Sequence, residues 1–359
     1  MPNDLHAMVT RTTTQPRAQP AGPCAMAIFG AGGDLTRRLV IPALYNLMAN
    51  RLLPDEFVLI GVDMAALSTE QWRQRLTEMM QGMLKGDGQL PNHLFLLLTM
   101  TAMEPPSSFD PDAVRNRKAD TLKAIPPISL DCAVRGQYGK GEVLGRPVAD
   151  YRQEPDVAAN SSIETYVALK LAIDTWRWAG VPFYLRTGKS MSQRWTEIAV
   201  CFRRAPLSLF QDTDVTQMTP NWLVLRIQPD EGISLQFQVK RPGQIVTLAP
   251  IGTNFLYKDW FPPSLNVGYE TLIYDCMIGD ASLFQRADMV EEGWRIVRPV
   301  LDAWAAEAPT DFPNYRAGST GPDAAAALLA NDNGRSWRPI GNHVSGSPHA
   351  THLVAARRR

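Results

Sequence analysis

Two sets of residues in this chain could bind phosphate. The first is the glycine-rich run from Gly30 to Leu35, which follows an apolar segment at 25–29. Glycine permits a tight bend and a close ligand approach, and free N–H groups at a helix start attract a pyrophosphate. The second set is Lys189 and Arg194, two cations that suit a phosphate or sugar hydroxyls. The alternatives are a packing turn and two solvated surface cations.

The elements predicted around the glycine turn are those of a dinucleotide-binding unit. Strands at 25–29 and 57–62 flank a helix at 36–50, whose apolar residues recur at helical spacing. Ser68 and Gln71 form a capping box, which predicts a further helix running to about Lys85. A full doubly wound sheet has about five or six strands, and the chain does not continue with them. We therefore expect a truncated Rossmann-like unit.

The rest of the chain changes from helical to strand patterning. Helices are predicted at 90–103, at 112–123 and again between 266 and 306. Strands rich in β-branched and aromatic residues are predicted at 165–173, 182–186, 197–203, 222–227 and 233–239. Because these strands follow one another without long helices between them, we expect a mainly antiparallel sheet.

The predicted fold class is α/β plus α+β, a truncated Rossmann-like nucleotide-binding unit joined to a large, mainly antiparallel sheet domain with helices. The predicted divisions are a disordered arm at 1–24, a partial dinucleotide-binding domain at 25–88, an α+β substrate and oligomerisation domain at 89–340, and a disordered tail at 341–359. Both ends are poor in large hydrophobic residues, so burial cannot offset the entropy lost on ordering them.

Composition excludes several classes of protein. Lysine plus arginine equals aspartate plus glutamate, at 36 each, so the chain has no net charge that would attract nucleic acid or an anionic membrane. The four cysteines are scattered, which argues against a metal site or a disulfide framework. We find neither a signal peptide nor a run of about 20 apolar residues. We expect a soluble, cytoplasmic protein that binds no metal.

Several motifs resemble those of the glucose-6-phosphate dehydrogenase family. Near the start they are Phe29 to Leu35, Arg38-Leu39 and Ile41 to Leu47. Further along they are Asn92-His93-Leu94, Ala102 to Pro106, Arg135 to Tyr138, Val167 to Leu171, Trp176 to Tyr184, Arg186 to Lys189, Phe284 to Arg286, Val300 to Trp304 and Trp337 to Ile340. The resemblance covers about nine-tenths of residues 25–340.

This resemblance implies a reaction and a set of site residues. The family oxidises glucose 6-phosphate to 6-phosphogluconolactone with NADP, the first step of the pentose phosphate pathway, so the chain should supply a base, a phosphate anchor and a coenzyme cradle. His93 would be the base, and Lys189 with Arg194 would contact the substrate. The coenzyme would lie on Gly30, Ala31, Gly32, Gly33, Asp34, Leu35, Arg38 and Asp63. A homo-oligomer, dimer or tetramer, is also implied.

The chain departs from the family in a long internal deletion between about Lys85 and Leu90. The family's Arg-Ile-Asp-His-Tyr-Leu-Gly-Lys segment, which carries the acid that orients the base and a His/Lys pair for the phosphate, has no counterpart. Gly88 stands where a substrate-binding aspartate is expected, and Asp87 is one position out. We therefore expect weak activity.

The coenzyme pocket also departs from the family pattern. Met64 stands where an arginine usually binds the 2′-phosphate of NADP, and Asp63 lies beside it. An acid at this strand end favours a free ribose hydroxyl, so NAD stays an alternative coenzyme, although Arg37 or Arg38 could compensate. Two alternative functional classes stay open: a non-catalytic partner of an intact dehydrogenase, and a damaged chain that does not fold stably.

Overall fold

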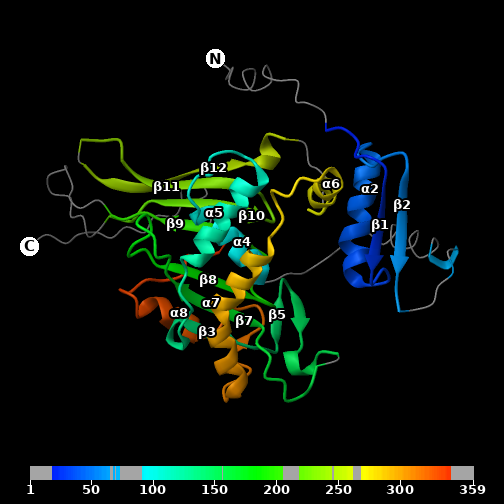
Figure 1. Ribbon diagram of the computed structural model, residues 1–359. Coiled ribbons are helices and arrows are strands. Elements are labelled where there is room, and N and C mark those ends of the chain that lie inside the picture. The colour runs from blue at the N-terminus through cyan, green and yellow to red at the C-terminus, as the bar shows by residue number, and fades with distance from the viewer. Residues whose placement is uncertain are drawn as a thin grey trace, which may run out of the picture. The chain divides into compact units, whose positions relative to one another are not determined.

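The computed structural model describes residues 18–64, 68, 70–72, 91–155, 157–204, 218–244, 246–261 and 268–340, with the backbone alone at 91–93. The chain divides into two compact units (Figure 1). Unit 1 comprises Met1–Gln89, Glu104–Arg117 and Ser264–Ala287. Unit 2 comprises Leu90–Met103, Lys118–Pro263 and Asp288–Arg359. Unit 1 therefore includes a segment from the second half of the sequence. A division of the chain into consecutive domains cannot include such a segment. The domain limits read from the sequence stay a prediction.

Unit 1 contains the predicted β-α-β arrangement. Strand β1 (Cys24–Phe29) pairs in parallel with β2 (Phe57–Val62). The connection between them contains a π-helical turn, η1 (Thr36–Val40), and helix α2 (Ile41–Ala49). The sequence predicted a single helix here, and the structure places the glycine turn and a distorted first turn before its regular part. Within the described residues of unit 1, this sheet has two strands, as the truncated Rossmann-like fold predicts.

The core of unit 1 lies on one face of this small sheet. Its buried residues are Ile41, Ala43, Leu44 and Leu47 of α2 together with Ile273 of α6 (Glu270–Ile278). Helix α6 is joined to α2 by a polar contact as well, in which Asn46 Nδ2 donates to Glu270 Oε1 at 2.6 Å. Two helices more than 200 residues apart in the sequence thus share one apolar core, which stabilises a sheet too small to fold securely alone.

The opposite face of the β1–β2 sheet is exposed. Alternation along the strands directs Met26 and Leu59 toward α2, while Phe29, Val58 and Ile60 keep 80%, 55% and 46% of their surface exposed. Parallel sheets are normally covered on both faces. Among the described residues no further strand or helix covers this apolar face, as we expect for a truncated nucleotide-binding unit.

The predicted helix from Ser68 to Lys85 is described only at its start. The Ser68 N–H donates to Gln71 Oε1 at 2.9 Å and the Gln71 N–H donates to Ser68 Oγ at 3.2 Å, which confirms the capping box. The Trp72 ring fills the space beside Gly61, where an added Cβ would lie 2.6 Å from it. The rest of this helix, the deletion site and most of the predicted terminal arm and tail lie outside the described residues.

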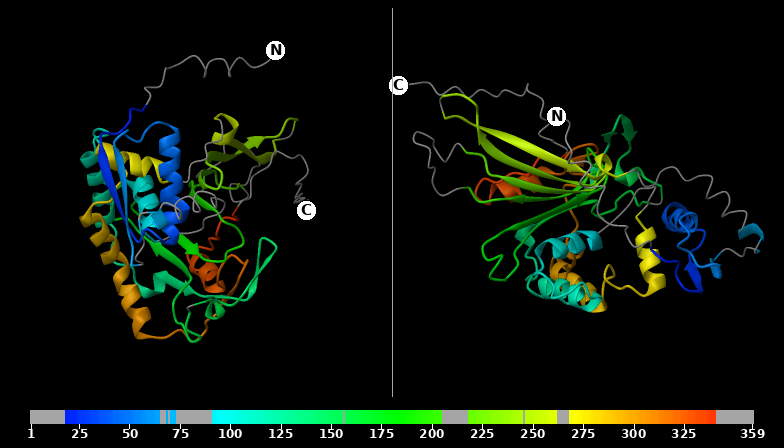
Figure 2. Two further views of the ribbon diagram at one scale, coloured as in Figure 1. Left: turned by 90° about the vertical axis from the view of Figure 1, so that its right-hand side faces the viewer. Right: turned by 90° about the horizontal axis from the view of Figure 1, so that it is seen from above.

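Unit 2 is built on two antiparallel sheets. One has the order β3-β7-β8, with β3 (Ala133–Gly136), β7 (Tyr166–Leu171) and β8 (Phe183–Gly188). The other has the order β12-β11-β10-β9, with β9 (Thr196–Cys201), β10 (Trp222–Gln228), β11 (Gly232–Lys240) and β12 (Leu248–Leu256). Figure 2 shows these four longer strands running side by side. The expected antiparallel arrangement is confirmed.

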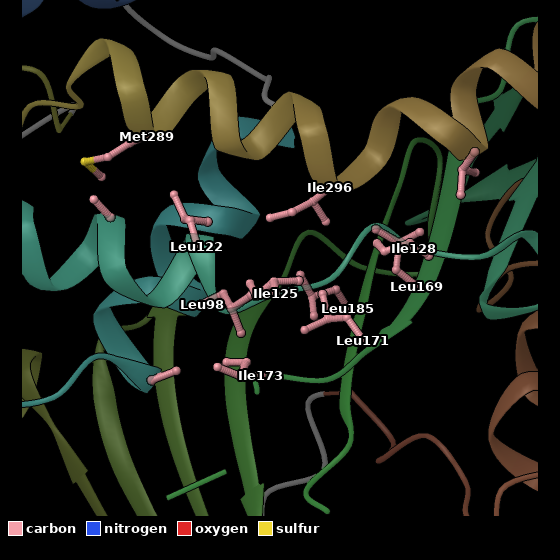
Figure 3. Close-up of a cluster of buried hydrophobic side chains, with 13 residues drawn as sticks. Leu98, Leu122, Ile125, Ile128, Leu169, Leu171, Ile173, Leu185, Met289 and Ile296 are labelled. Atoms are coloured by element: carbon pink, nitrogen blue, oxygen red, sulfur yellow. The ribbon is translucent and has the colours of Figure 1, made fainter. Parts of the chain in front are cut away.

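Three helices contribute to the main core of unit 2, which lies against the β3-β7-β8 sheet. They are α4 (Pro91–Ala102), the C-terminal part of α5 (Pro111–Lys123) and α7 (Ala287–Ala306). Figure 3 shows the core side chains meeting between these helices and the strands. The buried residues are Leu98, Ala102, Ala119, Leu122, Ile125, Ile128, Leu169, Leu171, Ile173, Leu185, Met289, Ile296 and Val300.

Several elements were not predicted from the sequence. Strand β12 contains Pro250 and Gly252, which mask its strand character. The segment 135–151, interpreted as a loop, instead holds β4 (Tyr138–Gly139) and the hairpin of β5 (Gly141–Val143) with β6 (Arg146–Val148). Strand β4 pairs in parallel with β13 (Tyr315–Arg316), ahead of helix α8 (Asp323–Ala330). The strands other than β12 have two or three residues each, too few to show a periodicity in the sequence.

The remaining elements are short 3₁₀ turns. They are η2 (Leu130–Cys132), η3 (Tyr151–Gln153) and η5 (Tyr257–Asp259). Among the described helices, none is both long enough and apolar enough to cross a bilayer.

Candidate functional site

The glycine turn of unit 1 has the geometry that its sequence predicts. Gly30 has φ +72°, a left-handed conformation that favours glycine, and at Gly33 an added Cβ would lie 2.9 Å from the Gly30 oxygen. Its backbone is fixed to the end of β2, because the Gly30 and Ala31 N–H groups both donate to the Val62 oxygen, at 2.8 and 3.1 Å. Glycine is thus required by the bend itself at these two positions.

Asp63 lies directly against this turn. The Gly32 N–H donates to Asp63 Oδ2 at 2.5 Å, so one backbone donor of the turn already faces an anionic oxygen. A dinucleotide phosphate would have to compete with this carboxylate for the Gly32 N–H. The glycine bend with an acid at the end of β2 fits a dinucleotide whose ribose hydroxyl is free, because Asp63 can accept a hydrogen bond from a hydroxyl and would repel a second negative charge.

The Arg38 side chain already has an ion-pair partner. Its guanidinium forms an ion pair with Asp34, four residues earlier. Its Nε atom is buried and has no hydrogen-bond partner among the described residues. Beside it, the Thr36 hydroxyl donates to the Gly30 oxygen at 3.2 Å and closes the start of η1, while Leu35 is exposed. The predicted coenzyme-binding residues 30–35, 38 and 63 are thus gathered around one turn.

His93 belongs to unit 2 and lies in the first turn of α4. The helix is fixed at its other end, where Trp178 Nε1 donates to the Ala102 oxygen at 2.8 Å. Leu98 of α4 and Leu185 of β8 share the main core cluster. The His93 side chain lies outside the described residues, so its role as the base stays a prediction.

Lys189 follows the end of β8, and its side chain is exposed. Within the part of the chain that the structure describes, its ammonium has no ion-pair partner. Gly188 before it must be glycine, because an added Cβ would lie 2.6 Å from the Tyr166 ring. Arg194 is also exposed and precedes β9. The connection from β8 to β9 thus presents both predicted substrate-binding cations.

A set of partly buried polar contacts involving β8 and β9 was not predicted. The Arg186 guanidinium stacks on Trp337, 4.4 Å from the ring centroid, and Arg338 pairs with Glu197 at 2.9 Å. Burial lowers the pKa of Arg186, while Tyr166 and Glu197 oppose that shift. In the sequence, the motif from Trp337 to Ile340 indicated that this region matters. Its partners in β8 and β9 are identified only in the folded chain.

No cluster of histidine, cysteine and carboxylate side chains suited to a metal ion occurs among the described residues. What the structure does bring together is the set of predicted coenzyme-binding residues around the glycine turn of unit 1. Helix α4, which contains His93, and the β8–β9 connection, which contains the two cations, both belong to unit 2, where α4 and β8 share the main core. The chemistry this supports is recognition of phosphate-bearing ligands at both places.

Family models match most of the chain. The model described as "Glucose-6-phosphate dehydrogenase, NAD binding domain" matches residues 27–106. The model described as "Glucose-6-phosphate dehydrogenase, C-terminal domain" matches residues 81–338.

Individual relatives agree with these matches. The chain is 43% identical over 262 residues to the glucose-6-phosphate 1-dehydrogenase of Chlamydia pneumoniae, which covers 72% of this chain and 51% of that protein. It is 41% identical over 250 residues to the Bacillus subtilis enzyme, at 68% and 51% coverage. The chain therefore spans about half the length of these curated relatives.

Solved structures share the fold. A glucose-6-phosphate 1-dehydrogenase from Mycobacterium avium matches with a TM-score of 0.69 at 23% identity, over 89% of this chain and 99% of that chain. A glucose-6-phosphate dehydrogenase solved in complex with its substrate glucose-6-phosphate matches with a TM-score of 0.70 at 21% identity and the same coverage. By its sequence matches, this chain belongs to the glucose-6-phosphate dehydrogenase family.

Proposed function

We propose that this chain binds glucose 6-phosphate and slowly oxidises its C1 hydroxyl, giving 6-phosphogluconolactone. The observation that carries the proposal is the exposed Lys189 ammonium at the end of β8, inside the region that matches the family's C-terminal domain. A cation that is not neutralised by a described neighbour suits a phosphate group. Arg194 supplies a second positive charge on the same connection.

His93 is proposed as the general base. Its place in the first turn of α4 agrees with this role, because α4 packs into the same core as β8, the strand that Lys189 directly follows. The imidazole takes the proton of the C1 hydroxyl as the C1 hydrogen leaves with its electron pair. A bound nicotinamide dinucleotide supplies the acceptor for that hydride.

Slow turnover is expected because the deleted segment carried the family's orienting acid and its His/Lys phosphate pair. Each charge-assisted contact to a phosphate contributes about 1.5–3 kcal/mol. Loss of the acid that orients a catalytic histidine lowers the rate by up to about 10⁴ in the serine protease triad. A kcat/KM lower by several orders of magnitude than that of an intact relative is therefore expected.

The proposed coenzyme is NADP, as in the family, with NAD as the alternative that Asp63 favours. The Asp63 carboxylate stands at the end of β2, beside the Gly32 amide, and a 2′-phosphate there would meet like charge. Arg38, which could offset that repulsion, is paired with Asp34. An assay with each coenzyme separates these alternatives.

The test is reduction of NADP and of NAD by glucose 6-phosphate, measured for the purified chain and three variants. His93→Ala should lower kcat by about 10²–10⁴ with little change in KM. Lys189→Ala should raise KM by about tenfold or more. Lys140→Ala removes another exposed lysine and should leave both constants unchanged. Turnover matching that of an intact relative would contradict the proposed impairment, and a Lys189→Ala variant with unchanged KM would contradict the proposed substrate site.

A second candidate is a non-catalytic family member that associates with an intact dehydrogenase. The bare apolar face of β1 and β2, with Phe29, Val58 and Ile60 exposed, favours it, because such patches mark interaction sites. Co-purification with a full-length dehydrogenase, reduced by Ile60→Asp, would support this candidate. A homo-oligomer, dimer or tetramer, is proposed on the same ground, and light scattering tests it. A cytoplasmic location is proposed because four scattered free cysteines suit a reducing compartment.

A further inference from the structure

The backbone around Lys189 is held on both sides. The Lys189 N–H donates to the Thr165 oxygen at 2.8 Å, and the Lys189 carbonyl accepts a hydrogen bond from the Tyr315 hydroxyl at 2.8 Å. The next residue, Ser190, has φ +49°, a left-handed conformation uncommon for a residue with a side chain. Such a conformation persists only where the surroundings impose it.

The surroundings that impose it come from residues 315–319. Besides the Tyr315 contact, the Gly318 N–H donates to the Ser190 oxygen at 2.7 Å, and the Ser192 N–H donates to the Ser319 oxygen at 3.0 Å. Three anchors therefore join this segment to the residues that start the β8–β9 connection. Tyr315, which is 126 residues away in the sequence, and the residues that follow it thus fix the backbone at Lys189.

Of these three hydrogen bonds, the one from Tyr315 is made by a side chain, and its donor and acceptor can be assigned. The Tyr315 hydroxyl lies 2.8 Å from the Lys189 oxygen and 3.0 Å from Thr165 Oγ1. Since a carbonyl cannot donate, Tyr315 donates its single hydrogen to Lys189 and accepts from the Thr165 hydroxyl. Thr165 Oγ1 in turn accepts from the Tyr138 N–H at 3.0 Å. The Tyr315 hydroxyl also lies 3.3 Å from the backbone carbonyl oxygen of Thr165, which is a longer contact.

Tyr315 keeps this role over the whole working pH range. Its side chain is only 6% exposed, and burial raises the pKa of its hydroxyl above the ordinary value. The hydroxyl therefore retains the proton that it donates. Its ring also packs at an angle on Tyr138 and Tyr166, with centroids 6.4 and 5.6 Å away, so the hydroxyl has little freedom to turn away.

We propose that Tyr315 is a positioning residue for the substrate site, holding the Lys189 backbone so that the ammonium is presented to the phosphate of the substrate. This inference rests on the proposed function, in which Lys189 binds that phosphate. A lysine side chain is long and flexible, so an ordered backbone at its root reduces the freedom that must be lost on binding. Tyr315 itself touches no substrate.

The test is Tyr315→Phe, which removes the hydroxyl and keeps the ring. We expect KM for glucose 6-phosphate to rise about threefold to tenfold, as for one lost hydrogen bond, with kcat changed less than about twofold. The matched control is Tyr151→Phe. Tyr151 packs against the buried cluster that contains Tyr315, with its ring 5.5 Å from that of Tyr138. Among the described residues, its hydroxyl takes no part in the hydrogen bonds that hold residues 189–192. This control should leave KM unchanged.

The double variant Tyr315→Phe with Lys189→Ala gives the sharper measurement. If Tyr315 acts through Lys189, the loss in the double variant should equal the loss in Lys189→Ala alone. Titration calorimetry with glucose 6-phosphate should reproduce these changes as changes in Kd. If Tyr315→Phe does not fold, Thr165→Val removes the group that donates to the Tyr315 hydroxyl, and we expect it to raise KM in the same direction.

The outcomes separate this inference from the proposed function. A raised KM in Lys189→Ala with an unchanged KM in Tyr315→Phe would overturn the positioning role and leave the proposed function intact. Additive losses in the double variant would overturn the role as well. If Lys189→Ala binds glucose 6-phosphate as well as the unaltered chain does, the proposed substrate site fails and the inference fails with it. In that case, amide hydrogen exchange of residues 186–195 would still show whether the Tyr315 hydroxyl orders this backbone.

Discussion

At the scale of single residues, the polar contacts of Asp332 link helix α8 to the sheet. Its carboxylate accepts a hydrogen bond from the Tyr184 hydroxyl and forms ion pairs with Lys170 at 3.0 Å and Arg335 at 2.8 Å. The Tyr184 hydrogen bond, followed by the cations, lowers the pKa of Asp332. Burial, followed by the same contact, raises the pKa of Tyr184 to about 12. The charged carboxylate and the protonated phenol therefore stabilise each other.

This pKa shift predicts a pH-dependent stability. Because the folded pKa of Asp332 is lower than the unfolded value, its contribution is complete above about pH 4 and is lost as the pH falls through the folded pKa. Asp332→Asn should lower Tm by about 2–4 °C at pH 7, and this difference should shrink below about pH 4. Thermal unfolding across pH 2–8 measures it. Asp302→Asn, which removes an exposed carboxylate of α7, should show no such pH dependence. A constant Tm difference down to pH 2 would contradict the prediction.

At the scale of elements, the connection from β13 to α8 depends on its glycines. Gly318 has φ +86°, and an added Cβ would lie 1.9 Å from the Glu142 oxygen. Gly321 has φ +111°, and an added Cβ would lie 2.5 Å from the Tyr166 ring. This close packing is what allows residues 315–319 to reach the backbone at Lys189. Gly293 within α7 is different, because nothing lies within 4 Å of its added Cβ.

Alanine at these glycines should therefore have opposite effects. Gly318→Ala should lower the free energy of unfolding by about 2–4 kcal/mol, because it adds left-handed strain and a clash with backbone. Gly293→Ala should raise it by about 0.5–1 kcal/mol, because alanine has a higher helix propensity. Urea unfolding of both variants gives the comparison. Equal stability of the two variants would show that residues 315–319 are not packed as described.

At the scale of the whole molecule, each of the two units has an apolar core of its own. Leu47 lies in the core of unit 1 and is 2% exposed. Ile296 lies in the core of unit 2 and is 0% exposed. Each core also joins segments distant in sequence, α6 with α2 in one case and α7 with β7 and β8 in the other. Units with cores of their own should respond separately to a core defect.

Truncating one core should therefore loosen one unit. Leu47→Ala and Ile296→Ala should each cost about 2–5 kcal/mol in the unit that contains them. In amide hydrogen exchange, Leu47→Ala should speed exchange in β1, α2 and α6, while Ile296→Ala should speed it in β7, β8 and α4. If both variants speed exchange equally throughout the chain, the two units unfold as one, and the prediction is wrong.

The amino-acid sequence by itself determined the type of most elements, the glycine turn and the family. Strand β2 begins and ends at the predicted residues, and the capping box of Ser68 and Gln71 forms as expected, because both depend on local patterns. The candidate cations also lie where their motif suggested, after the end of β8.

The tertiary structure alone decided which distant segments complete each unit and how the site residues are supported. Asp63 reaching the Gly32 amide, α6 completing the core of unit 1, and Tyr315 holding the backbone of Lys189 all join residues at least 31 positions apart. Hydrogen bonds and apolar contacts of this kind depend on the three-dimensional path of the chain. Local periodicity and spacing carry no information about that path, which is why these contacts could not be read from the sequence.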